Sequence, residues 1–267
     1  MKGVDLKSLL GRREAKYWVL LLLVLGMVYF LISDGEFSFA LTMSVILQAF
    51  AVALLIMKVL STKDTYGLSS DTLVCLALVL VGRLSSTLFF QGYLPYDASG
   101  DWLYQLMEIL CLLLVLYTLH LTSRSRQPTR TIVPWWTLAA PCFALALICH
   151  STLNAFFLTD VAWTFAMYLE GVAFWPQILL VHRSDVEVFT NHYVAAYGVS
   201  RVLSVLFWLF SFRELNNAFK PVTVNLLAGY AGYLVILAQV LQLLLVMDFL
   251  YYYVKSALTG AAFSLPR

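Results

Sequence analysis

Long apolar runs separated by short polar segments dominate this chain. Each run is close to the roughly 20 residues that an α-helix needs to cross a bilayer. The segments between runs carry turn-forming residues, as in GYLPYDASGD after the third run and SRSRQPTR after the fourth. The pattern predicts an all-α, polytopic membrane bundle without a separate soluble domain. The eight runs cover residues 17–33, 38–60, 69–90, 102–122, 132–150, 158–181, 192–211 and 226–254.

The composition supports a membrane protein. Of the 267 residues, 61% are hydrophobic and only 12% are charged, whereas soluble domains have about 25% charged residues. The lipid bilayer is therefore an expected partner. The formal charge of +2 is too small to indicate nucleic-acid binding. The four cysteines lie in apolar runs without metal-ligand spacing, so we expect buried free thiols and neither a metal nor a cofactor.

The basic residues predict the orientation of the bundle. Most Lys and Arg residues lie at the N-terminus, in alternate connecting segments and in the tail. The connecting segments on the other side contain only Arg213 and Lys220. Since basic residues collect on the cytosolic side of a membrane, both termini are predicted to be cytosolic.

The first apolar run is predicted to be retained. It is followed by the acidic segment SDGEF and not by a small-residue cleavage site, so we expect a signal anchor. We therefore divide the chain into a cytosolic N-terminus with one extra span, residues 1–36, and a seven-helix domain, residues 37–267.

Two segments of this domain resemble each other. The second run leads into MKVLSTKDTYGLSSDTL, and the sixth leads into LLVHRSDVEVFTNHYV. In both, an apolar helix is followed by a short charged turn and a polar entry into the next helix. Spans two to four and six to eight are thus predicted to be two three-helix units joined by span five, as in small transporters such as the SWEETs. The alternative is a chance likeness between two membrane hairpins.

Four ionisable residues lie well inside apolar runs: Arg83, Glu108, Glu170 and Arg201. Such a residue costs several kcal/mol unless it is paired or hydrated, so each is a candidate for function. Two are acidic and two are basic, so the interior can be neutral overall. Glu170 and Arg201 lie in successive antiparallel spans, and a kink is expected near Pro176. Their pair either fixes helix register or lines a ligand cavity.

Arg83 has no acid nearby in its own run. It therefore suits an anionic ligand group such as a carboxylate, which an Arg can bind in bidentate fashion. The alternative is pairing with Glu108 or Glu170. Trp163 and Trp208 either wall a cavity or pack. The chain has no HExxH, GxSxG or P-loop motif, and we predict that it is not an enzyme.

The stretch WTFAMYLEGVAFWPQILLVHRSDVEVFTNHYVAAYGVSR, residues 163–201, resembles the characteristic segment of the KDEL receptors, the ER lumen protein-retaining receptor family. The resemblance continues at Trp208, 248–258 and 263–266, and covers residues 38–267. It implies a SWEET- or PQ-loop-like core of seven helices in two repeats. The positions that match the family's ligand site are Arg83, Trp163, Glu170, Arg201 and Trp208.

The resemblance also implies a function. A cavity open to the Golgi lumen would bind the C-terminal KDEL or HDEL tetrapeptide of escaped ER proteins at mildly acidic pH. Vesicle coat machinery would then return the loaded receptor to the ER. The protein would reside in the ER membrane and the Golgi membrane.

The chain departs from the family pattern at several cavity positions. Leu41 and Gln48 stand where the family carries an Arg and a His, and Ser86 stands where it carries an Asp. Two Tyr, an Asn and an Arg of the penultimate helix are replaced here by Ser200, Ser204, Phe207 and Ser211. A short shift would let Arg213 replace that Arg. The tail lacks the family's Lys-rich run. The alternative function is therefore a divergent member that binds or transports another small ligand, without retrieval activity.

Overall fold

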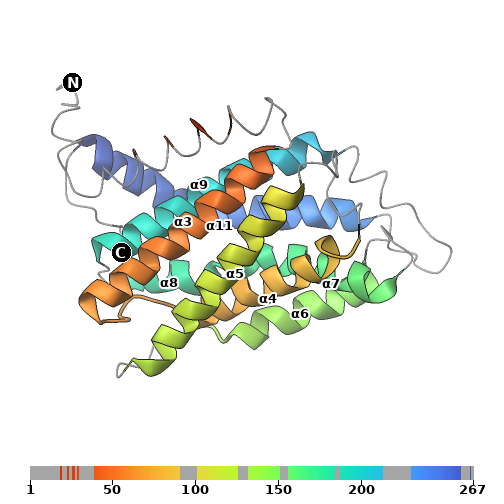
Figure 1. Ribbon diagram of the computed structural model, residues 1–267, viewed down its shortest axis with the longest axis horizontal. Helices are drawn as coiled ribbons and strands as arrows, with labels where there is room; N and C mark the ends of the chain where they lie inside the picture. Colours follow the sequence, from red (N-terminus) through yellow and green to blue (C-terminus); the bar gives the residue numbers. More distant parts are fainter. Residues whose placement is uncertain are drawn as a thin grey trace.

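The computed structural model describes residues 39–90, 101–125, 132–150, 156–183, 187–212 and 230–259, with Val19, Leu23, Gly26, Met27, Tyr29 and Leu265. The long elements in these ranges are all helices (Figure 1). They are α3 (Phe39–Thr62), α4 (Ser70–Thr87), α5 (Asp101–Arg124), α6 (Trp135–Ile148), α7 (Phe157–Val172), α8 (Trp175–Arg183), α9 (Val188–Phe210) and α11 (Ala231–Thr259). The predicted all-α membrane bundle is confirmed. Six spans are long and apolar enough to cross a bilayer, with α7 and α8 counted as one, and α6 is shorter.

The extra N-terminal span lies almost entirely outside the described residues. Its five described positions are helical. The rest of 17–33, the basic N-terminus, Arg213 and most of the tail are not among the described residues. The division into units 1–36 and 37–267 stays a prediction.

The helices form a ring with an interior. Around it, α3 packs on α9, α9 on α11, α11 on α7, α7 on α4, α4 on α5, and α5 on α3. The short α6 packs on α7 and, less extensively, on α4. In each predicted repeat the third helix packs on both others, α5 on α3 and α4, and α11 on α7 and α9. This shared arrangement is the one expected of two three-helix units joined by α6, and the repeat itself stays a prediction.

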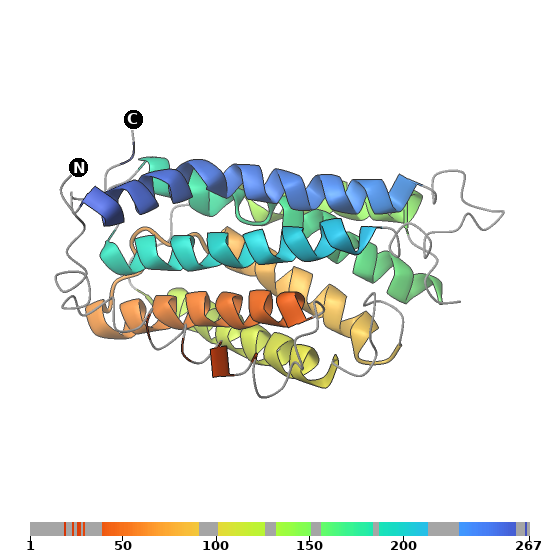
Figure 2. The same ribbon diagram turned by 90° about the horizontal axis from the view of Figure 1, so that it is seen from above.

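The described basic residues of the connecting regions mark one end of the bundle. Lys58, Arg124, Arg183 and Lys255 lie near the C-terminal ends of α3, α5, α8 and α11, and these ends lie on the same side (Figure 2). We call this side the basic end. That it faces the cytosol stays a prediction from the distribution of charge.

The kink expected near Pro176 separates α7 from α8. The helix α7 ends at Val172, four residues before the proline, and α8 begins at Trp175. A proline has no backbone N–H and its ring clashes with the carbonyl four residues earlier, so the helix breaks at this point. The break leaves the next backbone N–H, that of Gln177, to donate to Thr72 Oγ1 of α4 at 3.1 Å.

The side chain of Gln177 then ties the broken span to the start of α4. Its Oε1 accepts from the backbone N–H of Ser69 at 2.9 Å, and its Nε2 donates to the carbonyl of Gly67 at 2.9 Å. Ser69 in turn caps α4, because its hydroxyl accepts from the N–H of Thr72. Gln177 is buried. One amide thus fixes the turn between α3 and α4 against α8.

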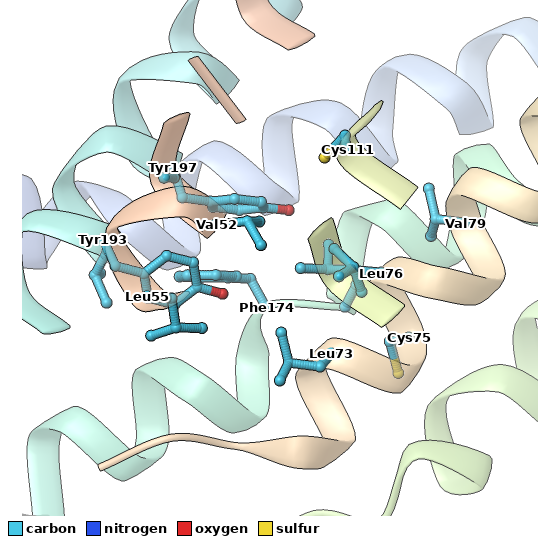
Figure 3. Packing of buried hydrophobic residues seen from close by; sticks show 14 of the residues in the cluster. Val52, Leu55, Leu73, Cys75, Leu76, Val79, Cys111, Phe174, Tyr193 and Tyr197 are labelled. Atoms are coloured by element: carbon cyan, nitrogen blue, oxygen red, sulfur yellow. The ribbon is translucent and has the colours of Figure 1, made fainter. Parts of the chain in front are cut away.

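The main apolar core fills the half of the ring nearer the basic end. Phe174, at the break between α7 and α8, stacks on Tyr197 of α9 with ring centroids 3.8 Å apart (Figure 3). Val52 and Leu55 of α3 and Leu76 of α4 belong to the same buried cluster. Apolar side chains fill the centre of this half of the bundle, and the ion pairs of the interior lie beyond it, further from the basic end.

Candidate functional site

Every helix of the ring contributes polar side chains to one buried network. Its members touch one another by hydrogen bonds, ion pairs or both. They are Ser44 and Gln48 of α3, Arg83 of α4, Tyr104 and Glu108 of α5, Glu170 of α7, Ser200, Arg201 and Ser204 of α9, and Gln239 of α11. The network lies on the side of the main core away from the basic end. The four intramembrane charges expected from the sequence therefore form one site.

Glu170 is the centre of the network. Its Oε1 accepts from Arg201 Nη1 at 2.5 Å, which is the contact expected from the sequence. Arg83 Nη1 donates to both carboxylate oxygens, at 3.1 and 3.2 Å, and Gln239 Nε2 donates to Oε2 at 3.1 Å. Both oxygens are satisfied and the side chain is fully buried. Two arginines from equivalent helices of the two repeats thus share one glutamate.

Arg83 also contacts a second acid. Its Nε pairs with Oε1 of Glu108, and the hydroxyl of Tyr104 donates to the same oxygen at 2.7 Å. Of the alternatives open for Arg83, the structure shows pairing with both glutamates. Arg83 Nη2 and Glu108 Oε2 are buried and have no hydrogen-bond partner among the described residues. The guanidinium of Arg83 therefore keeps N–H groups on Nη2 that could donate to a ligand.

Arg201 is held by uncharged groups on its other sides. Its Nη2 donates to Gln48 Oε1 at 2.7 Å, and its Nε donates to Ser200 Oγ at 3.0 Å. The guanidinium carbon lies 4.9 Å from the centre of the Tyr197 ring, a cation–π distance. Gln48 and Ser200 are two of the positions where the chain departs from the family pattern. Both accept hydrogen bonds from Arg201 here.

Two glycines let the helices approach closely beside the charges. A Cβ on Gly82, next to Arg83, would lie 2.9 Å from the carbonyl oxygen of Ala162 on α7. A Cβ on Gly171, next to Glu170, would lie 2.8 Å from the carbonyl oxygen of Ala238 on α11. Real Cβ atoms do not come this close to a backbone oxygen. The glycines therefore allow the separations at which Arg83, Glu170 and Gln239 meet.

A tryptophan pair lies beside the network, further from the basic end. The rings of Trp163 on α7 and Trp208 on α9 meet edge to face, with centroids 6.0 Å apart. Both are buried in a second apolar cluster that includes Leu41 and Phe207, two further departure positions. The tryptophans pack on each other, and Trp208 Nε1 has no hydrogen-bond partner in the described part of the chain.

The three remaining departure positions, Ser86, Ser204 and Ser211, are also buried. Ser86 donates to the carbonyl of Thr159 at 2.9 Å. Ser211, at the end of α9, is buried, and its hydroxyl has no hydrogen-bond partner within the described ranges. The replacement of Arg by Ser211 thus removes a cation from this end of α9.

The expectation of buried free thiols holds for most of the four cysteines. All four are free, and three of them are buried while Cys142 is partly exposed. Among the described residues no cluster of three or more His, Cys, Asp or Glu side chains is arranged to hold a metal.

The buried network has no net charge and carries N–H groups without a hydrogen-bond partner among the described residues. Two arginines and two glutamates cancel in charge. Buried N–H groups without a partner in the described residues remain on Arg83 Nη2, Gln48 Nε2 and Trp208 Nε1, against one carboxylate oxygen, Glu108 Oε2. Buried polar groups are normally hydrogen-bonded, so this excess of donors favours a ligand that accepts, such as a carboxylate.

Sequence reasoning missed Gln239 and Tyr104, and it named Gln48 as a departure from the family pattern without expecting its hydrogen bond to Arg201. Gln48, Gln239 and Tyr104 lie inside apolar runs and are buried. The same rule that singled out the intramembrane charges would have found the two amides, because a buried amide also needs partners. Tyr104 carried no such signal, since aromatic residues are common at the ends of membrane helices.

Comparison with known proteins gives a consistent result. The family model for the ER lumen protein retaining receptor matches residues 64–211. The chain is 27% identical over 221 residues to the ER lumen protein-retaining receptor of Entamoeba histolytica, covering 81% of this chain and 92% of that protein. It is 28% identical over 221 residues to that of Drosophila melanogaster, covering 82% and 94%. To receptor 2 of Homo sapiens it is 25% identical over 217 residues, covering 81% and 93%.

Proposed function

Because the chain belongs to the ER lumen protein retaining receptor family, we propose that it binds C-terminal KDEL- or HDEL-type signals in the Golgi for return to the ER. The family is named for receptors and not for an enzymatic reaction. Family membership and the long apolar helices support a multi-pass membrane protein of the ER–Golgi system. Vesicle coat machinery is the partner that such a return would need.

One observation carries this proposal. Arg83, Glu170 and Arg201 come from three helices and meet in one buried network, beside the pair formed by Trp163 and Trp208. Three buried donors without a partner among the described residues lie on members of this network and on Trp208. A peptide that ends in a carboxylate offers the acceptor that these donors lack.

The proposal predicts binding that depends on a free C-terminus. Peptides ending in KDEL or HDEL are titrated into the purified protein at about pH 5.5 and pH 7.5, because the family resemblance implies binding that is favoured at mildly acidic pH. A peptide of the same sequence with a C-terminal amide is the ligand control. We expect binding of the free acid, stronger at the lower pH, and at least tenfold weaker binding of the amide.

Two variants sharpen this experiment. Arg83→Gln removes the charge but keeps a donor, and should abolish peptide binding. Lys255→Gln removes an exposed cation at the basic end and should leave binding unchanged. A thermal melt of each variant shows whether it is folded. No binding of either peptide by the unmodified protein at either pH would overturn the retrieval proposal.

A second candidate function is binding or transport of another small ligand. The observation that favours it is the neutral network, in which both arginines are already paired with glutamates. In addition, Leu41 and Gln48 supply no charge where the family pattern has an Arg and a His. Uptake of small carboxylates into vesicles containing the protein, in the absence of peptide binding, would favour this candidate.

A further inference from the structure

Glu108 differs from Glu170 in how its carboxylate is used. Both oxygens of Glu170 accept hydrogen bonds, from Arg83, Arg201 and Gln239. Glu108 has partners only on Oε1, from Arg83 Nε and the Tyr104 hydroxyl, and its Oε2 has none in the described ranges. Glu108 is fully buried. A proton on Oε2 would therefore break no existing hydrogen bond, whereas a proton on Glu170 would.

Charge balance decides what must happen when an anion enters. The network contains two arginines, Arg83 and Arg201, and two carboxylates, Glu108 and Glu170. Adding one ligand carboxylate would leave a buried net negative charge, and an uncompensated buried charge is strongly unfavourable. One proton taken up at the same time restores neutrality.

We propose that Glu108 is the group that takes up this proton. The ligand carboxylate replaces Glu108 at Arg83, and a proton from bulk solvent adds to Glu108 Oε2. Arg83 keeps its charge throughout, so the cluster is neutral before and after binding. This deepens the retrieval function proposed above and rests on its premise of a carboxylate ligand. Proton uptake by Glu108 would make ligand binding stronger at acidic pH, even though Gln48, which stands where the family has a His, cannot titrate.

The groups around Glu108 make it the carboxylate best placed to take up the proton. The charged or titratable groups that face it from the described residues are Arg83 on α4, Tyr104 and Cys111 on α5, and Glu170 on α7. Arg201 of α9 reaches the network through Glu170. The neighbouring helix α3 presents the uncharged Ser44 and Gln48 to the network. Glu108 and Glu170 are the only carboxylates of this described set, and Glu170 is the one already satisfied by two arginines.

Calorimetry measures the proton directly. The KDEL-ended peptide, whose Lys stays charged over this pH range, is titrated into the full-length protein at several pH values, in two buffers with different ionisation enthalpies. Uptake of one proton makes the dissociation constant rise about tenfold per pH unit. We expect one proton for the unmodified protein and none for Glu108→Gln, which should bind at pH 7.5 about as tightly as the unmodified protein binds at pH 5.5.

Asp71→Asn is the matched control. Asp71 is also a buried carboxylate with one oxygen, Oδ2, that has no partner in the described part of the chain, but it lies toward the basic end and accepts from the backbone N–H of Trp135. This variant should still take up one proton. Proton uptake that persists in Glu108→Gln would overturn the proposal.

One further measurement requires no variant. Infrared difference spectra of the unmodified protein, with and without peptide at neutral pH, should show a new protonated-carboxyl band. Absence of the band overturns the proposal even if Glu108→Gln does not fold.

A smaller probe separates this proposal from the retrieval function. If the HDEL- and KDEL-ended peptides do not bind, the same titration is made with N-acetyl-leucine, a free carboxylate. Binding of this probe with uptake of one proton that Glu108→Gln abolishes would support Glu108 and overturn retrieval. Binding of neither probe would overturn both.

Discussion

Arg83 on α4 donates from a single nitrogen, Nη1, to both carboxylate oxygens of Glu170 on α7, at 3.1 and 3.2 Å. The same carboxylate also accepts from Arg201. Since Arg83 and Arg201 lie on the second helix of each three-helix unit, this one glutamate joins the two repeats at the centre of the ring. Stability and ligand binding should therefore both depend on it.

Removal of the Glu170 charge should be strongly destabilising. In Glu170→Gln, Arg83 keeps its pair with Glu108, but the buried Arg201 is left without a carboxylate partner among the described residues. Breaking a buried ion pair from one side costs about 3–5 kcal/mol. We expect a clear loss of thermal stability in detergent, measured by intrinsic fluorescence. Asp248→Asn changes an exposed acid of α11 outside the network and should melt like the unmodified protein. Equal stability of the two variants would contradict a structural role for Glu170.

The amide of Gln177 should fix the turn between α3 and α4. Gln177→Ala leaves the buried N–H of Ser69 and the carbonyl of Gly67 without their partner. Each unmet buried group costs about 1–3 kcal/mol, so we expect destabilisation of this order and faster proteolysis in the turn 63–69. Gln105→Ala, which removes a single partly buried hydrogen bond to the carbonyl of Thr87, is the milder comparison. A smaller effect at Gln177 than at Gln105 would argue against the clamp.

The close approach of α7 and α11 depends on Gly171. In Gly171→Ala the new Cβ would lie 2.8 Å from a backbone oxygen of α11, so the helices must separate. Overpacking of this kind costs about 1–3 kcal/mol. It should also lengthen the contact between Glu170 and Gln239. Gly26→Ala is the control, because a Cβ there meets nothing within 4 Å among the described residues. Thermal melts of the two variants test the difference.

Much of the bundle could be predicted from the sequence, because span length, basic residues and proline act locally. The apolar runs gave the helices, and Pro176 gave the break after Val172. The contact of Glu170 with Arg201 followed from their places on successive antiparallel spans. The partners of Arg83 could not be chosen in this way. Arg83 and Glu170 are 87 positions apart, and only the packing of α4 on α7 determines that they meet.

The role of Trp163 and Trp208 could not be decided from the sequence for a similar reason. A tryptophan in a membrane span either packs, faces lipid or lines a cavity, and composition does not separate these cases. The ring of Trp208 packs against Trp163, yet its Nε1 has no hydrogen-bond partner in the described residues. Packing and ligand contact are therefore compatible in one side chain, and they can be tested separately.

Trp208→Phe separates the two roles. It keeps an aromatic ring against Trp163 but removes the N–H donor. Since that donor has no partner among the described residues, thermal stability should change little. If a bound peptide accepts from it, its affinity should fall roughly threefold to tenfold, the net worth of one hydrogen bond. Leu206→Ala, at a half-exposed position outside the network on the same helix, should not weaken binding. Unchanged peptide affinity in Trp208→Phe would exclude this N–H from the binding site and leave Trp208 a packing role alone.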